Sequence, residues 1–238
     1  MLALLRTRRW LAFTALVIVA IVAFGLLSRW QWARAEQHRQ ERIDVVSRSA
    51  QEPVTIDQAL SQSDAGSWEW VAVSATGTYV PDSTRLVRQR PLDGSNGFWV
   101  VTTLRLGDGR TVAVCRGWIP VTGAATQAQS APPPPDGQVT VVGRLRSAEV
   151  PPSQVPSDLP SGQVPTLSPE LLGATITQAY VEQASTTPPD SSVKALPLPE
   201  IDEVRNVSYA VQWILFALVA LVGWFYFLRR EAREDAST

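Results

Sequence analysis

Two long apolar runs lie near the two ends of the chain. Residues 10–27 contain a single polar side chain, Thr14, and residues 211–228 contain one near their start, Gln212. Eighteen residues of helix cover about 27 Å, which is close to the roughly 30 Å hydrocarbon core of a bilayer. The pattern therefore predicts transmembrane helices at 10–27 and 209–228.

The first run also follows the kind of basic start that signal peptides have, because Arg6, Arg8 and Arg9 precede it. However, it is longer than the apolar region of most signal peptides, and the residues after it offer no small-residue cleavage site. We interpret the run as an anchor that is not cleaved.

Basic residues around the two runs predict the orientation. Three arginines follow the second run, which places 229–238 in the cytoplasm. Four arginines within 29–42 outnumber the three before the first run, so the first run alone predicts the reverse. Because two spans place both chain ends on the same side of the membrane, only one orientation is possible for both. We take the orientation that the second span predicts. The expected arrangement is a plasma-membrane protein with 1–9 and 229–238 in the cytoplasm and 28–208 outside it.

The middle of the chain changes from a helical to a β pattern. Residues 29–48 lack Gly and Pro, so the first helix is expected to continue out of the membrane and to end before Pro53. Gly107-Asp108-Gly109 between two β-rich runs predicts a hairpin. The expected strands are 68–79, 84–90 as an edge or exposed strand, 98–106, 110–116, 139–145 and 177–183. The expected fold class is a membrane protein with two transmembrane α-helices flanking one extracytoplasmic β-rich α+β domain.

Prolines interrupt this domain twice. Residues 131–135 contain four prolines and residues 151–169 contain six. Proline fixes φ and removes a backbone donor, so we expect irregular loops at both places. The apolar residues of 151–169 follow neither a helix nor a strand period, and the segment is therefore expected to be a surface loop that tolerates shortening.

Composition excludes several functions. The chain has 238 residues and a formal net charge of −1, which argues against a polybasic nucleic-acid-binding protein. Cys115 and His38 are the only residues of their kinds, so neither an intramolecular disulfide nor a Cys/His zinc site can form. A hydrolase would depend on one juxtamembrane histidine, so we expect no catalysis, no metal and no soluble substrate. We expect Cys115 to be a small strand residue with no redox role.

Four segments together resemble the surfeit locus protein 1 family, the assembly factors of cytochrome c oxidase. They are Trp30-Gln31-x-x-Arg34 after the first run, Gly97 with the strand that follows it, Cys115-Arg116-Gly117-Trp118-Ile119-Pro120, and Tyr209-Ala210-x-Gln212-Trp213 at the second run. Their order and spacing carry the resemblance, which covers nearly the whole chain. The family typically has Asn at the position of Cys115.

The resemblance implies a non-catalytic assembly or maturation factor, or a stably bound accessory subunit, of the haem-copper cytochrome c oxidase. The implied partners are oxidase subunits in the membrane and lipid, with no nucleic acid. We expect these residues to bind a partner: Trp30, Gln31, Arg34, Arg116, Trp118, Tyr209, Gln212 and Trp213.

Several of these residues have a structural alternative. Trp30 and Trp32 are also suited to anchoring at the membrane interface. Gln31 and Gln212 can bond to each other across the two helices or be hydrated at the headgroups. Trp118 is also suited to the core, and Gly117 to a bulge or a close backbone approach.

The resemblance also raises the question of haem. Some family members have a histidine three residues before the tyrosine of the fourth segment, and a role in handling haem a is attached to it. This chain has Asn206 there, and His38 lies about 16 Å beyond the first run along a helix. We therefore expect no cofactor. The alternative function is a two-span cell-envelope scaffold or sensor unrelated to the oxidase, although ten residues after Leu228 are few for a signalling element.

Overall fold

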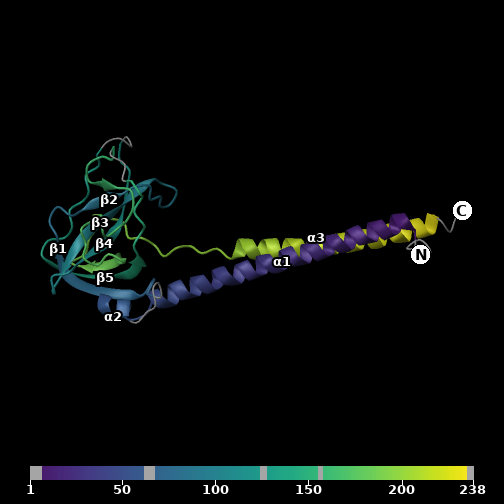
Figure 1. Cartoon of the computed structure of the whole chain (residues 1–238), viewed down its shortest axis with the longest axis horizontal. Helices are drawn as coiled ribbons and strands as arrows, with labels where there is room; N and C mark the ends of the chain where they lie inside the picture. Colours follow the sequence, from purple (N-terminus) through teal and green to yellow (C-terminus); the bar gives the residue numbers. More distant parts are fainter. Residues whose placement is uncertain (1–6, 62–67, 124–127, 155–157, 235–238) are drawn as a thin grey trace. The chain divides into compact units, whose positions relative to one another are not determined.

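Each apolar run lies within one long helix. Helix α1 (Arg8–Ser49) has 42 residues and helix α3 (Val204–Glu234) has 31. Both helices are long and apolar enough to cross a membrane. The computed structural model in Figure 1 confirms two such helices with a β-rich domain between them in sequence. It also confirms that the first helix continues past residue 27, whereas the membrane boundaries themselves stay a prediction.

The structure describes residues 7–61, 68–123, 128–154 and 158–234. These residues belong to two compact units, a helical unit of Met1–Asp44 with Pro199–Thr238 and a β-rich unit of Val45–Leu198.

The described residues of the β-rich unit form mainly strands, with one short helix, α2 (Ile56–Ser61), before them. Its described strands are β1 (Ala72–Tyr79), β2 (Arg85–Val87), β3 (Gly97–Leu106), β4 (Thr111–Pro120), β5 (Gln138–Ser147), β6 (Gln163–Val164) and β7 (Ala179–Thr187).

Five of the strands close into a barrel. They follow the order β1-β5-β7-β4-β3, and β1 pairs again with β3 to complete the ring. The pairs β4–β7 and β2–β6 are parallel and the others are antiparallel. Closure satisfies the backbone groups that an open sheet leaves at its edges, while β2 and β6 extend the sheet beyond β3.

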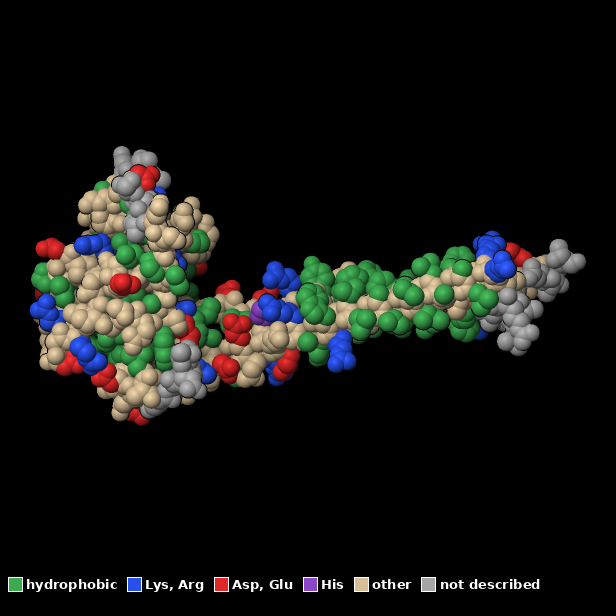
Figure 2. Space-filling model, in the orientation of Figure 1, with side chains coloured by type: hydrophobic (Ala, Val, Ile, Leu, Met, Phe, Trp, Pro, Cys, Tyr) green, Lys and Arg blue, Asp and Glu red, His purple; other side chains and the backbone are tan. Residues whose placement is uncertain are grey.

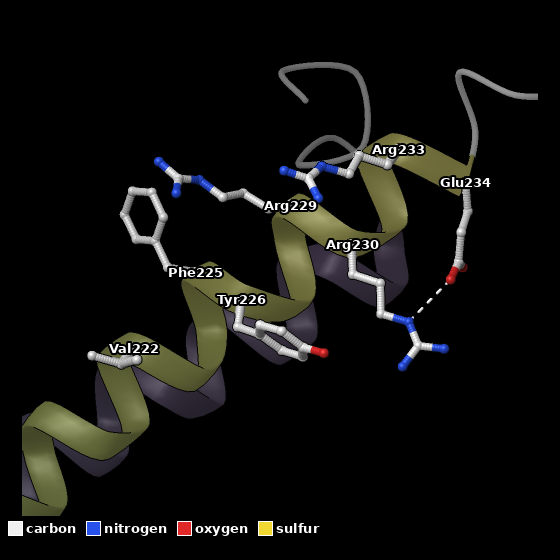
Figure 3. Close-up of a pocket in the computed structure, with 7 residues that line it drawn as sticks. All are labelled: Val222, Phe225, Tyr226, Arg229, Arg230, Arg233 and Glu234. Atoms are coloured by element: carbon white, nitrogen blue, oxygen red, sulfur yellow. Dashed lines mark hydrogen bonds and ion pairs between the residues drawn. The ribbon is translucent and has the colours of Figure 1, made fainter.

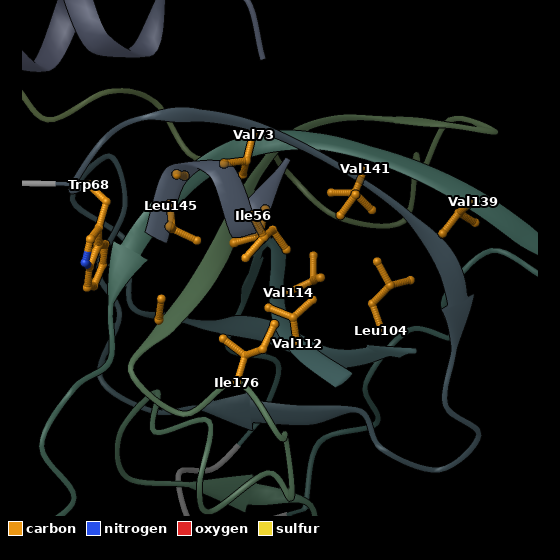
Figure 4. Close-up of a cluster of buried hydrophobic side chains, with 14 of the residues drawn as sticks. Ile56, Trp68, Val73, Leu104, Val112, Val114, Val139, Val141, Leu145 and Ile176 are labelled. Atoms are coloured by element: carbon orange, nitrogen blue, oxygen red, sulfur yellow. The ribbon is translucent and has the colours of Figure 1, made fainter. Parts of the chain in front are cut away.

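Alternate side chains of these strands fill the barrel. Val73, Leu104, Val141 and Leu145 are fully buried there, and Figure 4 shows them around Ile56 of α2. Burying a valine or leucine side chain stabilises a fold by about 1.5–3 kcal/mol, so this cluster supplies much of the driving force for folding of the unit.

The predicted hairpin is confirmed, but the first strand begins later than predicted. β3 and β4 pair around Gly109, whose φ is 87°. Trp68 and Trp70 lie in a turn, and β1 starts only at Ala72. The turn buries Trp68 in the core and gives Trp70 a φ of 68°, a conformation held by its N–H bond of 2.9 Å to the Leu145 carbonyl.

The predicted exposed edge at 84–90 is wrong. β2 lies between β3 and β6, and β6 comes from within the second proline-rich segment. The expectation of a surface loop is also wrong for residues 163–168, because Leu167 is fully buried beside Val87 and Val101. Prolines exclude regular pairing over most of this segment, but they do not prevent residues 163–168 from packing. Residues 155–157 of the predicted loop lie outside the described residues.

Sequence reasoning missed α2, although a local signal was present. The Thr55 hydroxyl accepts the Gln58 N–H at 3.2 Å, and the Gln58 side-chain oxygen accepts the Thr55 N–H at 3.0 Å. This reciprocal pair is a capping box, which the spacing Thr-x-x-Gln predicts.

Candidate partner-binding site on the helix pair

Helices α1 and α3 pack against each other along one seam. The buried seam residues of α1 include Trp10, Ser28 and Ala35, and those of α3 include Ala210 and Leu228. Half-buried positions between them recur at alternating steps of three and four residues. This spacing is the heptad pattern of a two-helix coiled coil.

Polar contacts set the register of the pair. The Ser28 hydroxyl donates to the Ala210 carbonyl at 2.9 Å, and the Trp224 indole N–H donates to the Thr14 hydroxyl at 3.0 Å. Residues early in α1 thus meet residues late in α3, so the helices run antiparallel. Hydrogen bonds of this kind contribute about 0.6–2 kcal/mol each in an apolar environment.

Two predicted binding residues lie in or beside the seam. Trp213 is half-buried and stacks on Phe24, with ring centroids 5.7 Å apart and an interplanar angle of 21°. Gln31 is half-buried, and its buried side-chain oxygen has no hydrogen-bond partner among the described residues. Gln212 is exposed, and the structure records no bond between it and Gln31. Trp213 therefore packs between the helices, and the bond across the helices is not formed.

The other four predicted helix residues share one flank. Trp30 and Arg34 are one turn apart on α1, and Tyr209 and Gln212 are about one turn apart on α3. With Ser28 opposite Ala210 in an antiparallel pair, both sets project to the same side of the seam. We call these four residues the Arg34 flank.

The Arg34 flank is open to a partner or to lipid. Trp30 is 61% exposed and Tyr209 is 46% exposed. The Arg34 guanidinium makes one long contact of 3.4 Å, to the side chain of Gln37. Trp32 is also exposed, at 57%, but its helical position places it on the opposite flank. Figure 2 shows hydrophobic side chains along most of the helix pair, with arginines gathered at both ends of this band.

The β-rich unit buries the predicted binding residue Arg116. Its guanidinium lies 2.7 Å from Asp190, and the two side chains are 0% and 3% exposed. It also donates to the carbonyls of Pro132 and Pro133 at 2.8 Å each, and to Ser192 at 3.0 Å. The residue therefore joins three segments of the unit, and its described contacts are internal to the domain.

Two buried side chains, Tyr79 and Cys115, lie close to Arg116. Its guanidinium carbon lies 5.9 Å from the centre of the Tyr79 ring. Burial raises the pKa of the Tyr79 hydroxyl, although the nearby Arg116 charge opposes this rise. Burial likewise raises the pKa of the neighbouring Cys115 thiol, and Glu182 adds to the effect. Cys115 is buried in β4, as expected for a small strand residue. A raised pKa disfavours the thiolate, which is the reactive form of cysteine.

Trp118 is also buried, and its indole N–H donates to the Arg90 carbonyl at 2.6 Å. Its ring packs on Gly97, where an added Cβ would lie 2.2 Å from the ring. Gly117 has a φ of 154°, and a Cβ there would lie 2.5 Å from the Lys194 carbonyl oxygen. The predicted close backbone approach at Gly117 is therefore confirmed. The predicted bulge is also confirmed, because the pairing of β3 with β4 shifts register between Gly117 and Cys115.

The residues around Asn206 do not fit a haem-binding site. Asn206 is half-buried on α3, and its amide is not one of the usual axial ligands of haem iron. With Ser28 opposite Ala210, Asn206 lies level with residue 32 of α1. His38 lies about 9 Å further along the helix axis and is 3.5 Å from Glu41. Within the described parts of the chain, no three His, Cys, Asp or Glu side chains are grouped as metal ligands.

Sequence reasoning missed the partners of Arg116. Asp190 follows two prolines in a segment expected only to lead back to the second apolar run, and it is 74 residues from Arg116. No local pattern predicts such a pair, because strand pairing brings it together.

The fold and the helix seam define a class of protein: a β-barrel domain between two apolar helices that pack as an antiparallel pair. Comparison with known proteins identifies the family. The SURF1 family model matches residues 18–218, and the chain belongs to this family.

Individual relatives agree with this assignment. An uncharacterized SURF1-like protein of Mycobacterium tuberculosis is 31% identical over 261 residues, which cover 100% of this chain and 91% of the relative. The corresponding protein of Mycobacterium bovis gives the same values. A SURF1-like protein of Dictyostelium discoideum is 26% identical over 113 residues, covering 44% of this chain and 42% of the relative.

Proposed function

We propose that this protein is a non-catalytic assembly factor, or a stably bound accessory subunit, of the haem-copper cytochrome c oxidase. Membership of the SURF1 family supports the link to the oxidase, because the family is known in general for oxidase assembly. In this proposal α1 and α3 cross the plasma membrane, both termini are cytoplasmic and the barrel lies outside.

The Arg34 flank carries the proposal for the contact site. It offers two exposed aromatic rings and a guanidinium within a short stretch of the helix pair. Tryptophan, tyrosine and arginine are the residues that most often dominate binding energy at interfaces. The flank lies at the end of the apolar band, where a membrane-embedded partner has both lipid-facing and water-facing surface. We propose that oxidase subunits contact this flank.

The experiment compares matched variants in a strain that lacks the chromosomal gene. Arg34→Ala with Tyr209→Ala should lower the mature oxidase, measured as haem a absorbance per milligram of membrane protein. This protein's own level, measured by immunoblot, should stay unchanged, since neither side chain holds the helix pair together. Loss of two interface anchors of about 2 kcal/mol each weakens a complex by roughly 1000-fold, so the oxidase content should fall severalfold.

Trp30→Ala and Trp32→Ala give a control on the same helix. Both remove an exposed tryptophan, but only Trp30 belongs to the Arg34 flank. The proposal expects a lower oxidase content for Trp30→Ala and a normal one for Trp32→Ala. Normal oxidase in the accumulating Arg34→Ala, Tyr209→Ala variant would reject the flank as the contact site. Normal oxidase in the deletion strain itself would favour an envelope scaffold unrelated to the oxidase.

A further inference from the structure

Two arginines near the end of α3 have no ionic partner among the residues that the structure describes. The described acids of this region are taken up by other arginines: Glu231 lies 3.8 Å from Arg9, and Glu234 lies 3.0 Å from Arg230. Arg229 and Arg233 form no ion pair with any residue that the structure describes. Within residues 7–234, the end of this helix therefore carries two guanidinium groups without a carboxylate partner.

These two groups share one face of the helix with apolar side chains. Arg229 and Arg233 are four residues apart, which separates them by about 6 Å along the axis on the same side. In Figure 3 they extend to the same side of the helix as Phe225, whereas the Arg230 side chain extends toward Glu234. All of these residues line one hollow together with Val222 and Tyr226. The Arg229 guanidinium carbon lies 5.4 Å from the centre of the Phe225 ring. Phe225 is 46% exposed and Val222 is 66% exposed.

We propose that this face binds an anionic glycerophospholipid. Guanidinium groups donate paired hydrogen bonds to phosphate oxygens, and two of them one turn apart can hold one headgroup. Val222 and Phe225 lie about one to two turns deeper in the apolar run, where an acyl chain of the same lipid would pack. Basic sites at the cytoplasmic ends of transmembrane helices bind anionic lipids in this way. An acidic soluble segment would use the arginines but leave the apolar half of the face uncovered.

The inference rests on the insertion of α3 in the membrane, which is part of the proposed function, but not on any contact with the oxidase. Vesicle flotation at alkaline pH measures insertion separately, and haem a content measures the oxidase role separately. A failure of lipid binding in a protein that floats with vesicles therefore counts against this inference alone.

The test uses the full-length protein purified in detergent, with lipid binding measured by native mass spectrometry. Phosphatidylglycerol is the anionic probe, and phosphatidylcholine with matched acyl chains is the neutral one. We expect phosphatidylglycerol to remain bound at concentrations where phosphatidylcholine does not. Arg229→Gln and Arg233→Gln should each weaken phosphatidylglycerol binding about 5-fold, and the double variant about 30-fold.

Arg230→Gln is the matched control, because it makes the same charge change in the same turn on a residue already paired with Glu234. We expect it to weaken binding less than 2-fold. Equal losses for Arg229→Gln and Arg230→Gln would show an effect of net charge only and overturn the proposed site. Equal binding of the two lipids, or displacement of phosphatidylglycerol by inorganic phosphate at similar concentrations, would also overturn it.

Discussion

Because Arg116 is buried, its substitution can distinguish a structural role from a partner-binding role. Arg116→Met removes the guanidinium but keeps an unbranched side chain of similar width. Asp190 then loses its cationic partner while only 3% of its side chain is exposed, and the carbonyls of Pro132 and Pro133 lose their donors. A residue that only contacts a partner would leave the domain unaffected, so the two roles predict opposite results.

The structure sets the size of the effect. Removing one partner of a buried ion pair costs about 3–5 kcal/mol, because the remaining charge is left buried. Asp190 also accepts hydrogen bonds from the Ser192 N–H and hydroxyl, so its carboxylate keeps part of its solvation. We therefore expect a loss near the lower end, about 3 kcal/mol. A domain of this size loses about 2–4 °C of melting temperature per kcal/mol, which gives roughly 6–12 °C.

The assay is thermal unfolding of the detergent-purified protein by near-UV circular dichroism, together with its level in membranes. Arg105→Met is the control, because Arg105 is an exposed arginine in β3 with no recorded ion pair among the described residues. We expect Arg116→Met to melt 6–12 °C earlier and to accumulate poorly, and Arg105→Met to behave like the wild type. An Arg116→Met protein with normal melting and normal accumulation but reduced oxidase would refute the structural reasoning and restore the binding role.

Two further substitutions test the packing of the β-rich unit. Leu167→Ala should destabilise it by about 2–5 kcal/mol, because the side chain is fully buried, whereas Val150→Ala, directly before the same proline-rich segment, should change little because Val150 is 86% exposed. Chemical denaturation of the two proteins compares them directly, and equal midpoints would mean that 163–168 does not pack as described. Gly117→Ala should cost about 2 kcal/mol or more, since its φ of 154° and the Lys194 carbonyl 2.5 Å from an added Cβ both oppose a side chain. Gly107→Ala, which has nothing within 4 Å of the added Cβ, is the comparison, and similar melting temperatures for these two variants would contradict the close approach.

Local patterns determined the parts of this protein that depend on neighbouring residues. An apolar run of eighteen residues is a property of a continuous segment, so both long helices followed from the sequence. The β3–β4 hairpin followed in the same way, since two β-rich runs and the Gly107-Asp108-Gly109 link are adjacent in the chain. The capping box at Thr55 was equally local and was available to the same reasoning.

Identification of the Arg34 flank required both the sequence motifs and the register of the two helices. The motifs identified Trp30, Arg34 and Tyr209 as residues of interest, but they do not say which of them face the seam. The register decided this, because placing Ser28 opposite Ala210 assigns every other position of both helices to the seam or to a flank. As a result Trp213 packs between the helices, while Trp30 and Tyr209 remain exposed.

Tertiary structure alone decided the closure of the barrel and the interior of the β-rich unit. β1 pairs with both β5 and β3, and no pattern within one strand specifies two distant partners. The same closure brings Arg116 to Asp190 across 74 residues, so that a residue predicted to bind a partner forms a buried ion pair instead. Leu167 is buried for a similar reason: its proline-rich segment has no period of its own, but the outer face of β2, β3 and β4 offers apolar surface that must be covered. Sequence patterns record what each segment prefers, whereas burial depends on which segments the fold places against one another.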